Sequence, residues 1–161
     1  MIDFETLWNT VLDDPELKKS YIHGPEHWAR VERNGIYIGE QTGADLTVIR
    51  LFALFHDCRR QNDGIDPGHG RRGAEYAKTL RHELIEISDE QFDTFYNACK
   101  LHTRQIHTED VTVGACWDAD RLDLGRIGIK PIAKFLNTTI AKNIVNNNEW
   151  ESLAEISLRK V

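Results

Sequence analysis

One stretch of the chain, from Leu46 to Phe55, is apolar almost all the way round a helix and runs directly into His56-Asp57. A helix that is apolar on every side is buried in the interior of a protein. A buried carboxylate is costly unless it is paired or coordinates a metal. The pair therefore indicates either a core histidine followed by a capping aspartate or one part of a metal site.

Helical periodicity runs through the whole chain, and no stretch alternates with the period of a strand. Pro25 suits the first position of a helix, and Ser88-Asp89-Glu90-Gln91 has the form of a capping box. We expect helices over residues 2–13, 25–43, 45–58, 69–82, 88–102 and 111–124, and two more after Pro131 that are separated near residues 146–148. The predicted fold class is all-α, a compact helical bundle formed by one domain of residues 1–161.

The composition excludes several classes of protein. A formal net charge of -6 argues against nucleic acids and anionic membranes as partners. No run of about 18 apolar residues predicts a transmembrane helix, and the acidic first five residues lack the features of a signal peptide. Cys58, Cys99 and Cys116 are far apart and odd in number, as expected for reduced thiols. We expect a cytoplasmic protein and leave its oligomeric state open.

Further ligand-type residues fall on the apolar faces of the expected helices. Residues three, four and seven apart share one face of a helix. By this rule His27, His102 and Asp120 each point inward, whereas Asp118 points away, about 200° round the helix from Asp120. Imidazole and carboxylate together suit Mn, Fe, Ni, Co or Zn better than they suit Mg or Ca.

The order of these residues resembles a known signature. His27, then His56-Asp57, then Asp120 is similar to the H…HD…D signature of the HD superfamily of metal-dependent phosphohydrolases. Residues 23–31 resemble the family's first-histidine helix, and residues 119–122 resemble its last-aspartate segment. The resemblance covers about residues 20–130. It implies an all-α bundle in which the four signature residues ligate a divalent transition metal. Residues 131–161 lie beyond the clear resemblance, and we expect them to pack on the bundle as C-terminal helices.

Two further histidines resemble positions whose role differs between members of this family. His69 begins the expected 69–82 helix, and His102 ends the 88–102 helix. Such histidines ligate a second metal in some members and contact the phosphate in others. Both roles stay open here, so the resemblance leaves one or two metals.

An anion-binding rim is expected beside the metal. The glycines among residues 68–73 would let a ligand approach the free N–H groups of a helix start. Arg71 and Arg72 lie at this start, and Arg59 and Arg60 directly follow the His-Asp pair and Cys58. Because arginine offers bidentate contacts to phosphate, we expect these four arginines to bind the phosphate of a substrate.

The resemblance implies a metal-dependent phosphohydrolase that acts on a small phosphomonoester or nucleotide. Asp57 would orient or deprotonate the attacking water, while His69 and His102 would neutralise charge on the phosphoryl oxygens. One alternative is a di-iron oxygenase of a small polyol or phosphonate, for which these two histidines and the four signature residues would supply the ligands. The other is a non-catalytic module that binds a metal or a nucleotide.

Overall fold

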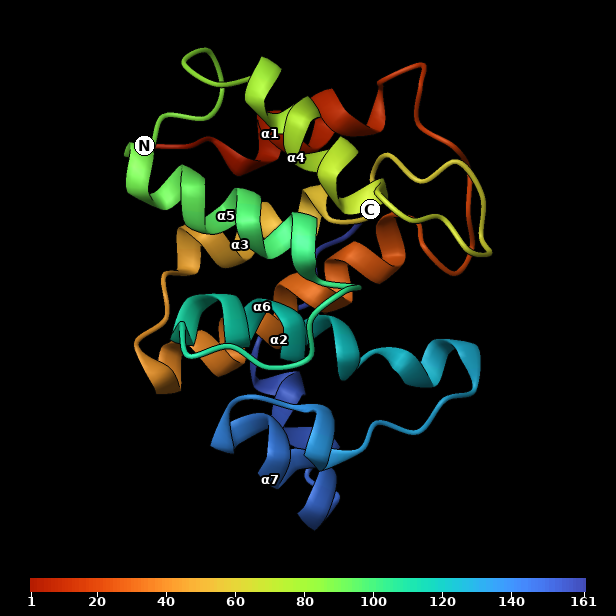
Figure 1. The fold of residues 1–161 in the computed structure, drawn as a ribbon, viewed down its shortest axis with the longest axis vertical. Coiled ribbons are helices and arrows are strands. Elements are labelled where there is room, and N and C mark those ends of the chain that lie inside the picture. Colours follow the sequence, from red (N-terminus) through yellow and green to blue (C-terminus); the bar gives the residue numbers. More distant parts are fainter.

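Helices and loops make up the whole of the computed structural model, which describes residues 1–161 (Figure 1). The prediction of an all-α fold is confirmed. The α-helices are α1 (Phe4–Leu12), α2 (Pro25–Thr42), α3 (Leu46–Phe55), α4 (His69–Thr79), α5 (Asp89–Leu101), α6 (Val111–Arg121) and α7 (Thr139–Asn147). Three short 3-10 helices follow α6: η1 (Leu124–Ile127), η2 (Ala133–Phe135) and η3 (Trp150–Glu155).

Capping side chains explain where most of these helices begin. Four helices are preceded by a residue whose side chain accepts hydrogen bonds from backbone N–H groups in the first turn of the helix: Asp3, Asp45, Asp110 and Thr138. Ser88 forms the predicted capping box with Gln91. Such caps satisfy donors that have no partner within the helix.

Several helices end before the residue expected from the sequence, among them α6, which ends at Arg121 and not at residue 124. Helix α3 ends at Phe55, so that Asp57 lies in the turn after the helix and not within it. Helix α4 ends at Thr79, three residues before His82, whose positive φ of 72° is incompatible with a continuing helix. The tail also holds one α-helix followed by a 3-10 helix where two α-helices were expected.

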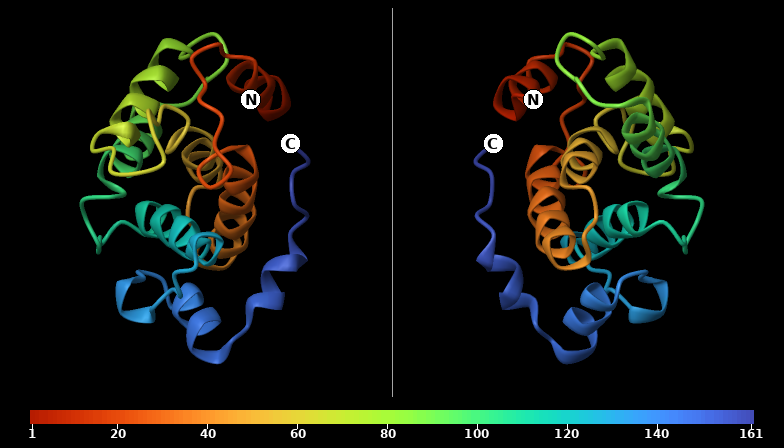
Figure 2. Two further views of the ribbon diagram at one scale, coloured as in Figure 1. Left: turned by 90° about the vertical axis from the view of Figure 1, so that its right-hand side faces the viewer. Right: turned by 90° about the vertical axis from the view of Figure 1, so that its left-hand side faces the viewer.

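Helix α3 lies at the centre of the molecule and packs against α2, α4, α5 and α6 (Figures 1 and 2). Its residues Leu51–Phe55 are completely buried, as its apolar sequence predicts. Because α3 is surrounded, its C-terminal end points into the middle of the bundle. His56 and Asp57 are therefore delivered to an interior position beside the ends of neighbouring helices.

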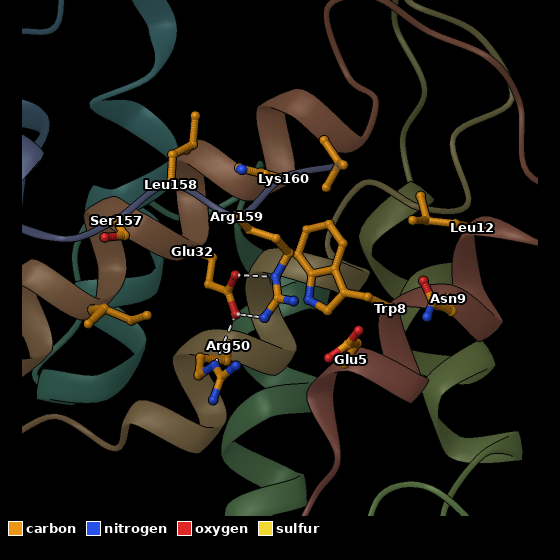
Figure 3. Close-up of a pocket in the computed structure, with 12 residues that line it drawn as sticks. Glu5, Trp8, Asn9, Leu12, Glu32, Arg50, Ser157, Leu158, Arg159 and Lys160 are labelled. Atoms are coloured by element: carbon orange, nitrogen blue, oxygen red, sulfur yellow. Dashed lines mark hydrogen bonds and ion pairs between the residues drawn. The ribbon is translucent and has the colours of Figure 1, made fainter.

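The C-terminal segment returns to pack against α1 and α2. Arg159 packs over the ring of Trp8 in α1 and donates hydrogen bonds to Glu32 of α2, which also accepts from Arg50 (Figure 3). Glu32 is only 4% exposed. A carboxylate buried to this degree needs such partners, so the C-terminal segment is fixed to α2.

Two glycines allow α4 to approach its neighbours closely. A Cβ on Gly73 would lie 1.9 Å from the Phe55 carbonyl oxygen, and one on Gly70 would lie 2.1 Å from the Cys99 carbonyl oxygen. The expectation that these glycines admit a ligand is therefore wrong, because neighbouring helices occupy the space. Their packing instead holds His69, at the start of α4, against the ends of α3 and α5.

Gly73→Ala is expected to lower the free energy of unfolding by about 3 kcal/mol or more, because the backbone of α3 must move to admit the methyl group. Gly125→Ala is the matched control, since a Cβ there meets nothing within 4 Å. Urea denaturation of both variants measures the difference. Equal stability of the two would contradict the close packing of α4.

No helix of this fold combines the length and apolar character needed to cross a membrane.

Candidate metal centre

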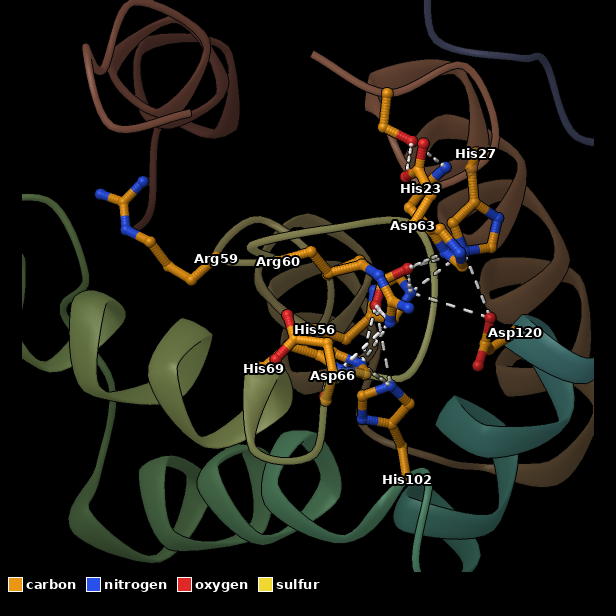
Figure 4. Close-up of polar contacts among 12 residues, drawn as sticks. His23, His27, His56, Arg59, Arg60, Asp63, Asp66, His69, His102 and Asp120 are labelled. Carbon is orange, nitrogen blue, oxygen red and sulfur yellow. Dashed lines mark hydrogen bonds and ion pairs between the residues drawn. The ribbon is translucent and has the colours of Figure 1, made fainter. Parts of the chain in front are cut away.

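The four residues of the H…HD…D signature converge between the start of α2, the end of α3 and the end of α6 (Figure 4). His27 Nε2 lies 3.2 Å from both His56 Nε2 and Asp120 Oδ1. His56 Nε2 lies 3.7 Å from Asp120 Oδ1, and Asp57 Oδ2 lies 3.7 and 3.8 Å from the two histidines. Ligand atoms about 2.1 Å from one metal are about 3.0–3.4 Å apart in octahedral or tetrahedral geometry. His27, His56 and Asp57 thus form a group that could hold one cation, and Asp120 Oδ1 lies beside its two histidines.

A second group of ligand atoms shares Asp57 with the first. Its other oxygen, Oδ1, lies 3.0 Å from His69 Nε2 and 3.8 Å from His102 Nε2. The two histidine nitrogens are themselves 3.0 Å apart. Each of the two groups contains a buried trio that could hold a metal ion. The single carboxylate of Asp57 therefore faces one group with each of its oxygens.

The second nitrogen of each of these histidines is fixed by an acceptor. The Nδ1 atoms contact Asp123 Oδ2 (His27, 2.7 Å), the Phe52 carbonyl (His56, 3.1 Å), the Asp66 carbonyl (His69, 2.6 Å) and the Cys99 carbonyl (His102, 2.6 Å). Because these partners only accept, each Nδ1 carries the proton and each Nε2 presents a lone pair.

The arrangement leaves lone pairs facing each other inside the protein. His27 Nε2 faces His56 Nε2, and His69 Nε2 faces His102 Nε2, with carboxylate oxygens beside both pairs. Neutral imidazoles in these tautomers have no hydrogen to place between them. A divalent cation in each group would satisfy all of these acceptors, so the residues fit the transition metals that imidazole and carboxylate prefer.

The protonation states of His56, His102 and the two aspartates also suit metal binding. Burial lowers the pKa of His56 to about 3 and lowers the pKa of His102. Burial alone would raise the pKa of Asp57, but His56, His23 and His69 outweigh it and hold that pKa well below its usual range. Burial likewise acts upward on the pKa of Asp120, whose hydrogen bond with His27 and neighbouring histidines bring it down. Neutral imidazole and ionised carboxylate are the forms that bind metals.

These shifts predict that the metal-free protein loses stability in mild acid. Between pH 6.5 and about 3, His56 takes up a proton in the unfolded chain but stays neutral where it is buried in the folded protein. The lowered pKa of His102 acts in the same direction. His27 opposes them in part, because its raised pKa adds stability that is lost as the pH rises. We expect the free energy of unfolding to fall by about 2 kcal/mol from pH 7 to pH 5. Urea denaturation in chelator measures it, and an unchanged value would contradict the burial of these histidines as neutral groups.

Two residues outside the signature hold the ligands in place. His23 Nδ1 lies 2.9 Å from Asp57 Oδ2. Asp123 accepts from His27 Nδ1 and, at 2.8 Å, from Arg30 Nε. The sequence reasoning assigned Asp123 no role. Its position one turn after Asp120, on the same side of α6 and its continuation, is the signal that could have found it.

Asp118 points away from the histidines, as predicted, but it is not a surface residue. It is completely buried. Its carboxylate accepts hydrogen bonds from the backbone of Asn137 (2.8 Å) and from the backbone and hydroxyl of Thr138 (2.7 and 2.9 Å). The chain after η2 returns to cover this face of α6, which periodicity within α6 alone does not show.

The expected rim of four arginines does not form, and only Arg60 reaches the ligands. Its Nη1 lies 3.1 Å from both ring nitrogens of His69 and 3.5 Å from Asp57 Oδ1. The carbonyl oxygens of Asn62 and Gly64 accept from its other nitrogens and fix the guanidinium. Arg60 is thus the one arginine of the four placed to meet an anion at the centre.

The other three arginines are engaged elsewhere or face solvent. Arg59 pairs with Asp14 at 2.7 Å, lies over the ring of Tyr76 and points away from the cluster (Figure 4). Arg72 donates to both oxygens of Asp66, and Arg71 is exposed. Carboxylates outside the centre therefore already satisfy two of the residues expected to bind phosphate.

The cysteines take no part in the centre. Cys58, Cys99 and Cys116 are free and buried. Burial raises the pKa of Cys58 to about 12 and raises the other two well above the usual value. A thiol that stays protonated is neither a nucleophile nor a metal ligand, so the centre consists of histidines and aspartates.

Comparison with known proteins agrees with this geometry. The family model of the HD domain matches residues 25–137, from the first residue of α2 to the segment that covers Asp118. This stretch is well over half of the chain and contains every candidate ligand. No curated protein and no solved structure matches the chain. The chain belongs to the HD domain family, a superfamily of metal-dependent phosphohydrolases that bind divalent metals.

Proposed function

We propose that this protein is a metal-dependent phosphohydrolase of small phosphomonoesters or nucleotides, in which Asp57 holds two divalent cations side by side. The observation that carries the proposal is the position of the two Asp57 oxygens, each of which faces a separate group of histidine Nε2 atoms. Two adjacent cations are a common device for stabilising the attacking and leaving oxygens of a phosphoryl transfer.

The reaction is the attack of water on the phosphorus atom of RO–PO₃²⁻, with cleavage of the bond to RO. The products are ROH, which receives a proton from the water, and inorganic phosphate. When bound, the divalent cations would supply Lewis acidity and lower the pKa of a water molecule. Asp57, His27, His56 and Asp120 would hold one cation, and Asp57, His69 and His102 would hold the other.

Arg60 and His23 would assist from the protein side. The fixed guanidinium of Arg60 would donate hydrogen bonds to phosphoryl oxygens as their charge changes. His23 would keep Asp57 oriented through its hydrogen bond to Oδ2. In this proposal His69 and His102 bind the metal and do not contact the phosphate directly. Of the four arginines that the sequence predicts to bind phosphate, only Arg60 would do so.

We further propose that residues 1–161 form one domain. Helix α1 contributes Leu7 and Trp8, and η3 contributes Leu153, to the same hydrophobic core as α3. The segments outside the matched family region would therefore fold together with it.

A second function uses the same residues. The six ligands, from α2, α4, α6 and the turns that follow α3 and α5, would also hold two irons, and the protein would then oxygenate a small polyol or phosphonate. The shared Asp57 favours this reading as much as it favours a two-metal hydrolase. Metal identity and oxygen consumption distinguish the two.

The test is elemental analysis of protein purified without chelator, followed by a phosphomonoester panel with Mn, Co, Ni, Zn and Fe. We expect about two metals per chain and release of inorganic phosphate that chelator abolishes. The variant His69→Ala/His102→Ala should keep the first metal and lose the second. Redox-active iron with oxygen uptake on a polyol or phosphonate, and no phosphate release, would overturn the hydrolase proposal. Bound metal without any turnover would indicate a binding module.

A further inference from the structure

Two loops cover the outer side of the candidate metal centre. Residues 13–24 join α1 to α2, and residues 56–68 join α3 to α4. The Ser20 hydroxyl donates a hydrogen bond to Asp63 Oδ1 at 2.5 Å and so ties the first loop to the second (Figure 4). The first loop lies before the residues that the family model matches.

An inner cavity between these loops leads to Asp57. Its volume is about 220 Å³, and its lining includes Lys18, Lys19, His23 and Arg60. Pockets that enclose a whole small molecule usually measure about 300–1,000 Å³. The inner cavity therefore has room for a phosphoryl group and little of the alcohol to which it is joined.

The two lysines at this cavity are free to meet an anion. Both are exposed. Four carboxylates line the two cavities: Asp14 pairs with Arg59, Asp63 accepts from Ser20, Asp57 faces the ligand histidines, and Glu26 forms no ion pair. In a chain with a net charge of -6, two adjacent unpaired lysines beside Arg60 make the cavity a local site of positive charge.

An outer cavity continues from the inner one across the same lysines. It measures about 570 Å³ and shares Lys18, Lys19 and Ser20 with the inner cavity. Beyond them its lining is mostly apolar, with two carboxylates, Asp14 and Glu26, beside the apolar residues Leu12, Pro15, Leu17, Tyr21, Pro25 and Val161. The Tyr21 side chain is 98% exposed. An apolar and aromatic lining with a few convergent charges is typical of sites for small molecules.

We propose that Lys18, Lys19 and Tyr21 form a second subsite, which takes the apolar or aromatic body of a substrate whose phosphate lies in the inner cavity. The lysines bind the phosphate where the cavities meet, and the Tyr21 ring packs on the body of the substrate. The preferred substrates are phosphomonoesters of aromatic or apolar alcohols, not of small polar ones. This inference rests on the proposed phosphohydrolase function.

Binding of phenylphosphonate and methylphosphonate to the manganese-loaded protein tests the subsite without turnover. Their carbon–phosphorus bond is not a substrate for phosphate-ester hydrolysis, and titration calorimetry measures each affinity. We expect phenylphosphonate to bind about tenfold more tightly, which corresponds to burial of roughly 55 Å² of apolar surface. The wild-type preference should disappear in Tyr21→Ala.

Matched variants separate the subsite from general effects. Ile65→Ala is the control for Tyr21→Ala, because Ile65 is 94% exposed on the other loop and lines neither cavity. The double variant Lys18→Gln/Lys19→Gln should weaken both phosphonates about tenfold, whereas Lys78→Gln/Lys130→Gln, which removes the same charge from exposed lysines elsewhere, should not.

The outcomes distinguish this inference from the function on which it rests. Equal affinity for the two phosphonates, or a preference that survives in Tyr21→Ala, would overturn the second subsite and leave the phosphohydrolase proposal standing. Failure of phosphonates and inorganic phosphate alike to bind the manganese-loaded protein would overturn both. A preference lost in Tyr21→Ala and kept in Ile65→Ala would support the subsite.

Discussion

Asp57→Asn is expected to reduce metal content and phosphatase activity together, with turnover falling by about 10³-fold or more. The substitution preserves the size of the side chain but removes the charge that both groups of histidines share. One amide oxygen can face only one of the two groups, and the amide nitrogen cannot ligate a metal. No other residue of the centre presents a ligand atom to each of the two groups, so no neighbour can replace it.

Asp63→Asn is the matched control for this prediction. Asp63 lines the same cavity as Asp57 but contacts Ser20 and none of the ligand histidines. It should keep the metal content of the wild type. Elemental analysis after gel filtration and phosphate release measure both variants. If Asp57→Asn retained the metal stoichiometry of the wild type, the bridging role of this carboxylate would be wrong.

Much of the fold follows from local sequence patterns. The apolar run from Leu46 to Phe55 predicts a surrounded helix, and that helix occupies the centre of the bundle. The helix starts at Ser88 and Pro25 follow from a capping box and a proline at the first position. These features depend on residues within one or two helical turns, which is why the sequence alone defines them.

The inward positions of the ligands are also predictable, but their partners are not. Periodicity places His27, His102 and Asp120 on apolar faces, and the structure brings all three to the centre. Periodicity does not show that Asp57 divides its two oxygens between two groups. That division depends on how α4 and α5 lie against the end of α3, which is set by helix packing at Gly70 and Gly73.

The arginines show why closeness in the sequence to a metal ligand does not by itself predict a phosphate-binding residue. Arg59 and Arg72 lie close to the ligands in the sequence, but they form ion pairs with Asp14 and Asp66 instead. An arginine binds whichever carboxylate the fold presents at the right distance, and this is not encoded within its own segment. Lys18 and Lys19, which come from before the signature, reach the cavity instead.

Replacement of Asp118 by alanine is expected to lower stability and leave metal binding intact, whereas replacement of Asp120 by alanine is expected to do the opposite. Asp118→Ala removes the acceptor of the Asn137 and Thr138 backbone N–H groups, which leaves buried donors without a partner. Each such donor costs about 1–3 kcal/mol, so the free energy of unfolding should fall by about 3 kcal/mol or more. The ligands of the centre are untouched, and the folded fraction should bind metal as the wild type does.

Asp120→Ala should lose metal and keep the fold. Its carboxylate is 20% exposed and contacts His27 and His56 at the ligand positions, so its removal takes one ligand from the first group. Chemical denaturation in chelator measures the stability of both variants, and elemental analysis at low temperature measures their metal content. If Asp118→Ala does not fold, Asp118→Asn keeps one acceptor oxygen for the same comparison. A stable Asp118 variant without metal, or an Asp120→Ala variant with full metal content, would show that the wrong aspartate of α6 has been assigned to the centre.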